Sequence, residues 1–125
     1  MSKIAVIGSG TWGTALAQTL NDNGHNVMIF GNRQEQIDDI NINHKNTFYF
    51  GEDVVLDKKL KASTDLEEVL LDREVILLSV PTAAMRSVLE KVKPLLKKKV
   101  IFINTAKGFD VDGHKWWDIE GSEYE

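Results

Sequence analysis

Three glycines near the N-terminus have the spacing of a phosphate-binding turn. Gly8, Gly10 and Gly13 directly follow the apolar residues 4–7, and helix-forming residues come next. In the order strand, glycine turn, helix, this pattern is typical of dinucleotide binding. The first glycine permits the turn, the second lets a pyrophosphate approach the backbone, and the third lets the helix pack on the strand. The first N–H groups of that helix would then bind the phosphates, and a glycine-rich turn without a ligand is the alternative.

The residues after the second apolar run bear on the choice of nucleotide. Residues 27–30 are apolar, so a strand, a helix and a second strand fit within the length of one βαβ unit. An acidic residue usually follows the second strand and binds the ribose 2′-hydroxyl of NAD. This chain has Gly31, Asn32 and Arg33 there. Arg33 could pair with the 2′-phosphate of NADP, stack on adenine, or be an exposed arginine that starts a helix, and the sequence leans towards NADP.

Two later apolar runs predict further parallel strands. Residues 75–80 are followed by Pro81, and residues 100–104 lead to Lys107. The carboxyl ends of such strands lie at the edge of the sheet where open α/β folds bind their ligands. Lys107 could therefore bind a substrate phosphate or polarise a hydroxyl or carbonyl group, and a solvated surface lysine is the alternative.

The segment between the second strand and these runs has a mixed pattern. We expect a helix over residues 33–44, and then an irregular segment over 46–61 with one short strand at 54–56. The aromatic residues 48–50 are expected to be buried against the neighbouring helix rather than to form a partner surface.

Composition excludes several classes of function. The formal net charge of −4 leaves no basic surface for nucleic acid or an anionic membrane. The chain has no cysteine, and His25, His44 and His114 lack ligand spacing, so no metal site is expected. No apolar run approaches the roughly 20 residues that span a bilayer, and no signal peptide is expected. These observations predict a soluble, cytoplasmic protein without membrane insertion.

We therefore predict an α/β fold of the Rossmann type, with a doubly wound, mostly parallel sheet and flanking helices. The dinucleotide-binding domain is expected over residues 1–108 of the 125 residues. Residues 109–125 form an acidic tail in which no strand or long helix is predicted. Trp116 and Trp117 in this tail could pack on the sheet edge or form a surface that something else covers.

These residues resemble the NAD(P)-dependent glycerol-3-phosphate dehydrogenase family of bacterial type, from Lys3 to about Gly108. Trp12 within the glycine turn and the pair Lys107-Gly108 are the more specific features. The resemblance is carried by Gly8-Ser9-Gly10-Thr11-Trp12-Gly13-Thr14-Ala15-Leu16-Ala17, Asn23-Gly24-His25 with Val27, Ile40-Asn41 with Asn46, Ala62 with Thr64-Asp65-Leu66, Val80-Pro81, and Thr105-Ala106-Lys107-Gly108.

The resemblance implies hydride transfer between NAD or NADP and the pair sn-glycerol 3-phosphate and dihydroxyacetone phosphate, which feeds phospholipid synthesis. Its partners would be these small-molecule substrates, and a homodimer is possible. Lys107 would touch both cofactor and substrate, and Pro81 would lie at the nicotinamide side. The implied cofactor-binding residues are Gly8, Ser9, Gly10, Thr11, Trp12, Gly13, Asn32, Arg33, Pro81 and Lys107.

The chain also departs from the family pattern. Phe50 stands where the family usually has a proline before a glycine. In the family an all-helical domain follows and supplies the general acid–base lysine, so no catalytic residue is assigned within this chain. We expect the chain to bind the cofactor but to turn over substrate negligibly. The alternatives are a stand-alone dinucleotide-binding or sensing module, supported by Trp116 and Trp117, and a dehydrogenase for another 2-hydroxy or phosphorylated compound.

Overall fold

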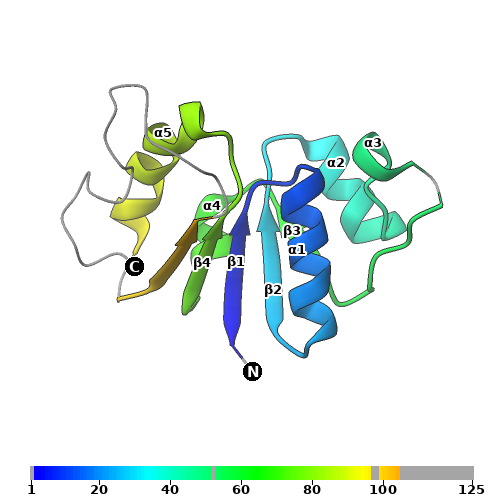
Figure 1. Ribbon diagram of the computed structural model, residues 1–125, viewed down its shortest axis with the longest axis horizontal. Helices are drawn as coiled ribbons and strands as arrows, with labels where there is room; N and C mark the ends of the chain where they lie inside the picture. The colour runs from blue at the N-terminus through cyan, green and yellow to red at the C-terminus, as the bar shows by residue number, and fades with distance from the viewer. Residues whose placement is uncertain (1, 52, 97–98, 105–125) are drawn as a thin grey trace.

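A computed structural model describes residues 2–51, 53–96 and 99–104 of the chain (Figure 1). In this part of the chain five strands form one sheet in the order β3-β2-β1-β4-β5. All four strand pairings are parallel. The strand order reverses between β1 and β4, as it does at the ligand-binding crevice of doubly wound folds, and the Rossmann-type prediction is confirmed. The strands are β1 (Lys3–Ile7), β2 (Asn26–Phe30), β3 (Lys61–Ser63), β4 (Val75–Leu78) and β5 (Ile101–Asn104).

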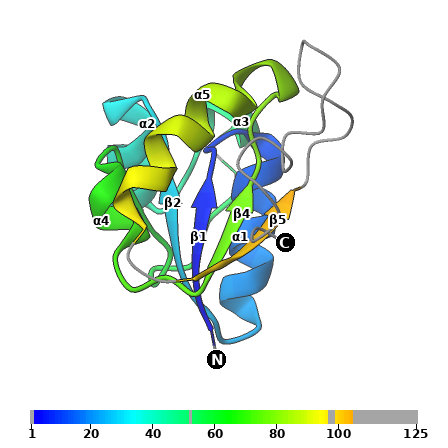
Figure 2. The same cartoon turned by 90° about the vertical axis from the view of Figure 1, so that its left-hand side faces the viewer.

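Helices cover both faces of this sheet. Figure 2 shows α1 on one face, with α4 and α5 on the opposite face. The helical elements are α1 (Thr11–Asp22), α2 (Gln34–Asp38), the π-helix η1 (Asp39–Asn43), α3 (Thr47–Phe50), α4 (Leu66–Leu70), α5 (Thr82–Val92) and the 3₁₀-helix η2 (Lys93–Leu95).

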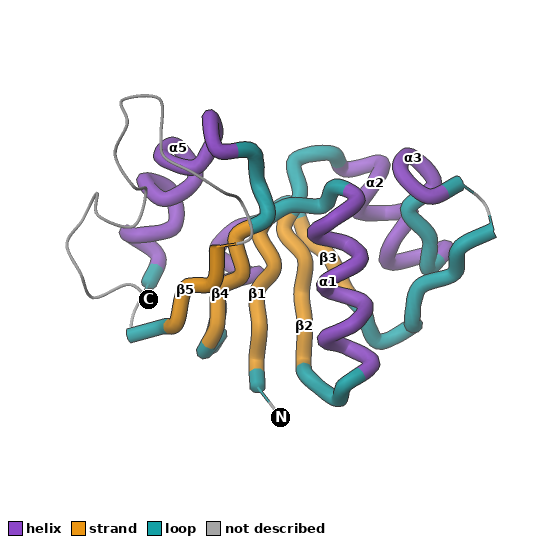
Figure 3. Tube along the Cα trace, viewed as in Figure 1, coloured by secondary structure: helices purple, strands orange, loops and turns teal. Residues whose placement is uncertain are grey.

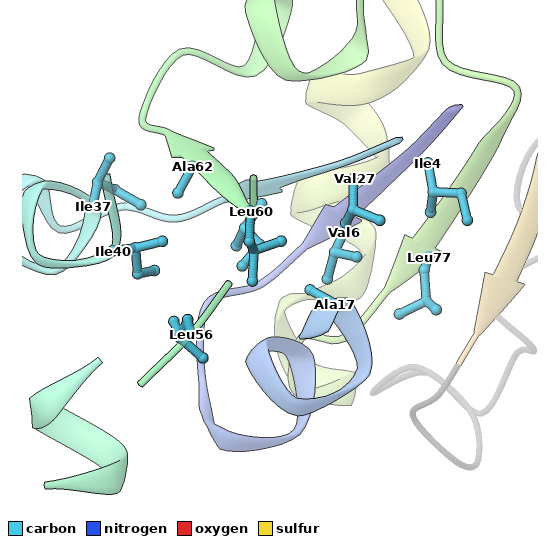
Figure 4. Packing of buried hydrophobic residues seen from close by; sticks show 11 residues of the cluster. Ile4, Val6, Ala17, Val27, Ile37, Ile40, Leu56, Leu60, Ala62 and Leu77 are labelled. Atoms are coloured by element: carbon cyan, nitrogen blue, oxygen red, sulfur yellow. The ribbon is translucent and has the colours of Figure 1, made fainter. Parts of the chain in front are cut away.

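Alternate residues of β1 serve two separate hydrophobic cores, which explains its unbroken apolar run. Ile4 and Val6 pack with Ala17 of α1 (Figure 4). Ala5 and Ile7 pack on the other side, with buried residues of α4 and α5. Both faces of a parallel strand are covered in this way, so apolar side chains are stabilised at every position. The result is a rigid base for the turn that follows at residue 8.

The helix predicted over residues 33–44 changes type part-way along. It begins as α2 and continues directly as the π-helix η1, in which the His44 N–H bonds the carbonyl oxygen of Asp39. The Asn41 side chain in this turn pairs with the backbone of Ala62, accepting from its N–H and donating to its carbonyl, each at 2.8 Å. The Asn41 side-chain amide therefore bonds the backbone of β3 in the way that a neighbouring strand would, and it ties η1 to this strand.

The strand predicted at residues 54–56 is wrong, because the third strand forms later, at Lys61–Ser63. Val54 and Val55 are 41% and 68% exposed, and Leu56 alone of the three is buried. A strand needs a neighbouring strand that pairs with its backbone groups. In the described part of the chain, the one backbone–backbone hydrogen bond of residues 54–56 runs from Leu56 N to His44 O. The apolar residues 54–56 predicted a buried strand, but the path of the chain leaves Val54 and Val55 exposed.

Candidate nucleotide-binding site

Gly8 and Gly13 are required by the way β1, α1 and the end of β4 meet. Gly8 has a φ of +124°, and a Cβ atom there would overlap the carbonyl oxygen of Ser79. A Cβ atom on Gly13 would overlap the carbonyl oxygen of Gly8. The first glycine therefore makes the tight turn, and the third lets α1 pack against that turn. Both steric roles predicted for these glycines are confirmed.

Gly10 differs from the other two glycines because no described atom excludes a side chain there. Its φ and ψ of −76° and −169° are open to any residue. The nearest atoms to a Cβ on Gly10 would be ring atoms of Tyr49, at 3.9 Å. The bare backbone at Gly10 thus leaves space on the outside of the turn, which suits the close approach of a pyrophosphate.

The start of α1 presents an uncapped helix terminus at this point. Gly10 is the N-cap residue, so no side chain caps the first N–H groups, and the first turn contains no acidic residue. The first turn of a helix leaves N–H donors without helical partners, and the helix dipole adds positive potential. An uncapped terminus at a steric opening fits the two phosphates of a dinucleotide.

A network of buried side chains lies beneath the turn and holds Ser9. The carbonyl oxygen of Ser9 accepts hydrogen bonds from Gln36 Nε2 at 2.8 Å, Asn46 Nδ2 at 3.1 Å and Thr14 Oγ1 at 3.2 Å. The Ser9 hydroxyl donates to Gln36 Oε1 at 2.7 Å. Gln36, Asn46 and Thr14 are 7%, 1% and 0% exposed. The centre of the glycine turn is therefore fixed from inside by polar groups of α1, α2 and the segment before α3.

Asp39 holds the segment that contains Asn46, because its carboxylate bonds the first residue of the next helix, α3. Its carboxylate accepts hydrogen bonds from the Thr47 N–H at 2.9 Å and hydroxyl at 3.0 Å, and from Asn43 at 3.0 Å. Burial alone would raise the pKa of Asp39. The bonds from Thr47 and Asn43, with the positive charge of Lys45, outweigh burial and place this pKa below its ordinary value.

The remaining predicted residues lie around this turn. Trp12 is in the first turn of α1 and is 61% exposed. Asn32 and Arg33 are exposed at the carboxyl end of β2, where Arg33 is the N-cap of α2. Pro81 is exposed at the start of α5, directly after Val80, a side-chain atom of which would lie 3.4 Å from a Cβ on Gly8. In Figure 3 the turn and the starts of α1, α2 and α5 share one end of the sheet, as predicted.

Arg33 also lines a hollow of about 380 Å³ beside the network. Gln36 and Asn46 form part of its wall, and Glu35 and Asp38 bring negative charge to it. Asp39 also lines this hollow, so one cationic side chain and three carboxylates set the electrostatic potential at the end of β2.

Several expectations fall on residues outside the described part of the chain. Lys107 lies there, and so do Trp116 and Trp117, the support for a binding module without catalysis. The boundary after Gly108 stays a prediction. The side chain of Thr11 is likewise not described, although its backbone starts α1. Among the described residues, no cluster of three or more potential metal ligands occurs, and no helix is long and apolar enough to cross a membrane.

Three buried polar residues that support the turn from beneath were not predicted from the sequence. Gln36 stands beside apolar positions of its helix and would ordinarily be assigned to solvent. Asn46 belonged to the resemblance but carried no role, and Thr14 was one residue of a helix. Tyr49 was expected to be buried, yet it is 46% exposed beside Gly10. Only the spacing of Asn46 from α2, set by the π turn, brings these side chains together.

Known proteins match this chain over most of its length. A family described as "NAD-dependent glycerol-3-phosphate dehydrogenase N-terminus" matches residues 3–118. The glycerol-3-phosphate dehydrogenase [NAD(P)+] of Streptococcus uberis is 52% identical over 113 residues, 90% of this chain and 33% of that protein. The enzyme of the same name from Streptococcus agalactiae is 51% identical over the same shares. The chain thus spans about a third of the length of these relatives.

Solved structures give the same likeness. The crystal structure of glycerol-3-phosphate dehydrogenase from Coxiella burnetii has a TM-score of 0.84 and 30% identity, covering 92% of this chain and 35% of that one. The glycerol-3-phosphate dehydrogenase structure from Plasmodium falciparum has a TM-score of 0.78 and 30% identity, covering 88% of this chain and 33% of that one.

Proposed function

The chain belongs to the family described as NAD-dependent glycerol-3-phosphate dehydrogenase N-terminus, and from this premise we propose that it binds NAD or NADP through the turn at Gly8–Gly13. The whole enzyme would interconvert sn-glycerol 3-phosphate and dihydroxyacetone phosphate. One observation carries the binding proposal: α1 starts without a cap at Gly10, a glycine that no internal contact requires.

The residues of this chain would hold the cofactor rather than move the proton. When bound, the nicotinamide supplies the hydride chemistry. The N–H groups at the start of α1 would hold the pyrophosphate, and Asn32 and Arg33 would flank the adenosine end. Pro81 would border the nicotinamide, and Lys107 would place positive charge near the reacting oxygen of the substrate. The general acid–base lysine is expected in the part of the family that this chain does not match.

Replacement of Gly10 by serine tests the binding proposal without disturbing the fold. Serine is a favoured N-cap, so Gly10→Ser should keep or raise the melting temperature, while its hydroxyl occupies the N–H groups that a phosphate would use. We expect at least a tenfold loss of NADH affinity, about 1.4 kcal/mol. The fluorescence of Trp12, in a chain carrying Trp116→Phe and Trp117→Phe, reports binding. Unchanged affinity in Gly10→Ser, or no response of the parent chain to NADH and NADPH, would overturn the proposal.

We propose NADPH as the favoured nucleotide. Support comes from Arg33 at the end of β2 and from the absence of an acidic residue at positions 31 and 32. Because Glu35 and Asp38 oppose a second phosphate, the preference should be small. Arg33→Leu should weaken NADPH binding by about tenfold and leave NADH binding nearly unchanged. A chain that binds NADH more tightly than NADPH would contradict this preference.

Catalysis should need more than these 125 residues. The chain alone should not oxidise NADH with dihydroxyacetone phosphate at a measurable rate, since none of its residues is assigned as the general acid–base group. Robust turnover by the chain alone would contradict this. We also propose a cytoplasmic location and a homodimer, the latter tested by sedimentation over a range of concentrations.

A further inference from the structure

We propose that Asn46 and Gln36 are positioning residues for the dinucleotide: they hold the peptide between Ser9 and Gly10 so that its N–H faces the pyrophosphate. This inference rests on the proposed function, because it concerns the same turn. It adds two residues that act through the Ser9 carbonyl, Gln36 at 27 and Asn46 at 37 positions from Ser9 in the chain.

The geometry of one peptide unit carries the inference. Asn46 and Gln36, together with Thr14, donate three hydrogen bonds to the Ser9 carbonyl oxygen from inside the protein. A trans peptide is planar, so its N–H points opposite to its carbonyl, and no cis peptide occurs in the described residues. The Gly10 N–H is therefore directed away from the buried network, towards the partly exposed side of the turn.

The two amide side chains fix each other's orientation. Gln36 Nε2 uses one hydrogen on Ser9 O and the other on Asn46 Oδ1, at 3.0 Å. Asn46 Nδ2 likewise bonds Ser9 O and Thr14 Oγ1, the latter at 3.0 Å. Rotation of either amide would bring its oxygen against the Ser9 carbonyl oxygen. Gln36, Asn46 and Thr14 are all buried, so a rotated amide would also leave buried N–H donors without acceptors.

Because residue 10 is a glycine, the peptide between Ser9 and Gly10 needs these hydrogen bonds to keep its orientation. The peptide before a glycine can rotate with little steric resistance, because glycine accepts both signs of φ. A rotated peptide would present the Ser9 carbonyl oxygen to the ligand and repel the phosphates. Position 10 must nevertheless lack a side chain if the pyrophosphate is to approach. Hydrogen bonds from Asn46 and Gln36 supply the order that the residue itself cannot.

The test compares two asparagines of the same segment. Asn46 holds Ser9, whereas Asn41 holds the backbone of Ala62 through two bonds of 2.8 Å and does not touch the turn. In the full chain we expect both Asn46→Ala and Asn41→Ala to lower the melting temperature. Asn46→Ala should in addition weaken NADH and ADP binding by about tenfold, the scale of one lost hydrogen bond, while Asn41→Ala should not.

Adenosine separates positioning of the turn from general damage, because it has no phosphate. Asn46→Ala should lose clearly less affinity for adenosine than for ADP. Gln36→Ala removes one of the three donors to Ser9 and should show the same pattern, which keeps the test open if Asn46→Ala fails to fold. Equal losses for ADP and adenosine, or equal NADH affinity in the Asn46 and Asn41 variants, would overturn the inference. A parent chain that binds neither NADH nor ADP would instead overturn the proposed function, and the positioning role with it.

Discussion

The Ser9 hydroxyl occupies the space that a side chain on Gly31 would need. A Cβ atom on Gly31 would overlap Ser9 Oγ and lie 2.8 Å from Ser9 Cβ. Gly31 directly follows β2, and its N–H bonds the Ser63 carbonyl at 3.2 Å, so it cannot withdraw from the sheet. Ser9 and Gly31 therefore connect the glycine turn after β1 to the end of β2. These are the two places at which we propose that NAD or NADP binds.

Gly31→Ala should consequently damage the turn through Ser9. The added methyl group would displace the Ser9 hydroxyl from Gln36, with an expected loss of about 1–3 kcal/mol in the free energy of unfolding. Urea denaturation measures this loss. The same substitution in a Ser9→Gly background should cost clearly less, because the two Ser9 atoms are gone and the remaining close atom, Ile37 Cδ1 at 3.1 Å, is the end of a flexible side chain. Equal costs in the two backgrounds would show that Ser9 and Gly31 are not coupled.

Two glycines with positive φ allow steric overlap to be separated from backbone strain. Gly8 has a φ of +124° and Gly24 a φ of +90°. A Cβ on Gly8 would strike Ser79, whereas a Cβ on Gly24 would meet no atom within 4 Å. Gly24→Ala should cost about 1–3 kcal/mol from strain alone. Gly8→Ala should cost about 3 kcal/mol or more, since overlap adds to strain. Thermal unfolding of both variants distinguishes the terms, and equal melting temperatures would contradict the assigned overlap.

The sequence predicted the fold wherever the signal was local. The apolar run at 4–7, the spacing of Gly8 and Gly13, and the stop at Asn23-Gly24 each depend on neighbouring residues, and α1 ends at Asp22 as that stop requires. The strand at 54–56 was wrong because apolar character cannot say which backbone will lie alongside. Only the chain path decides that, and it brings Lys61–Ser63 beside β2 instead.

The candidate site was predictable in its outer part only. The spacing of Gly8, Gly10 and Gly13 predicts a phosphate-binding turn, because each position depends on the small size or the backbone freedom of glycine. The support beneath the turn consists of polar side chains from separate segments. The sequence does not show whether a glutamine such as Gln36 or an asparagine such as Asn46 is buried or exposed. Gln36 lies in α2 and Asn46 follows the π-helix η1, and no periodicity in the sequence indicates that π-helix.

Arg73 should stabilise the sheet from the end opposite the glycine turn. Its guanidinium donates to the carbonyl and side-chain oxygens of Asn26, at 3.2 and 2.8 Å, and to the carbonyl of Val69 at 3.0 Å. Burial lowers the pKa of Arg73, and the charge of Asp72 opposes that shift. Arg73→Met would leave these oxygens without their donor and should cost about 2–3 kcal/mol in urea denaturation.

Lys59 provides the control for Arg73, because it is an exposed cation that lines, together with Arg73 and Asn26, a second hollow at the start of β2. Lys59→Met should change the free energy of unfolding by about 0.5 kcal/mol or less. Arg73→Lys should recover part of the loss, since one ammonium group cannot reach all three oxygens. A loss in Arg73→Met no larger than in Lys59→Met would show that these hydrogen bonds contribute no net stability.

Asp39 should make the folded state sensitive to acid. Its pKa lies below the ordinary value of 3.8 in the folded chain, so its contribution to stability is complete above that value. The contribution is lost as the pH falls from about 4 through the lower, folded pKa, where the carboxylate must be protonated and its bonds to Thr47 and Asn43 weaken. Asp39→Asn should therefore be less stable at pH 6 and lose less stability between pH 5 and pH 3. Urea midpoints at these pH values measure the difference, with Asp53→Asn, an exposed residue, as the control for net charge.

Because Asp39 holds the segment that carries Asn46, NADH affinity should fall over the same acid range in the parent chain. A parallel decline of stability in the parent and Asp39→Asn chains would assign the acid sensitivity to other carboxylates.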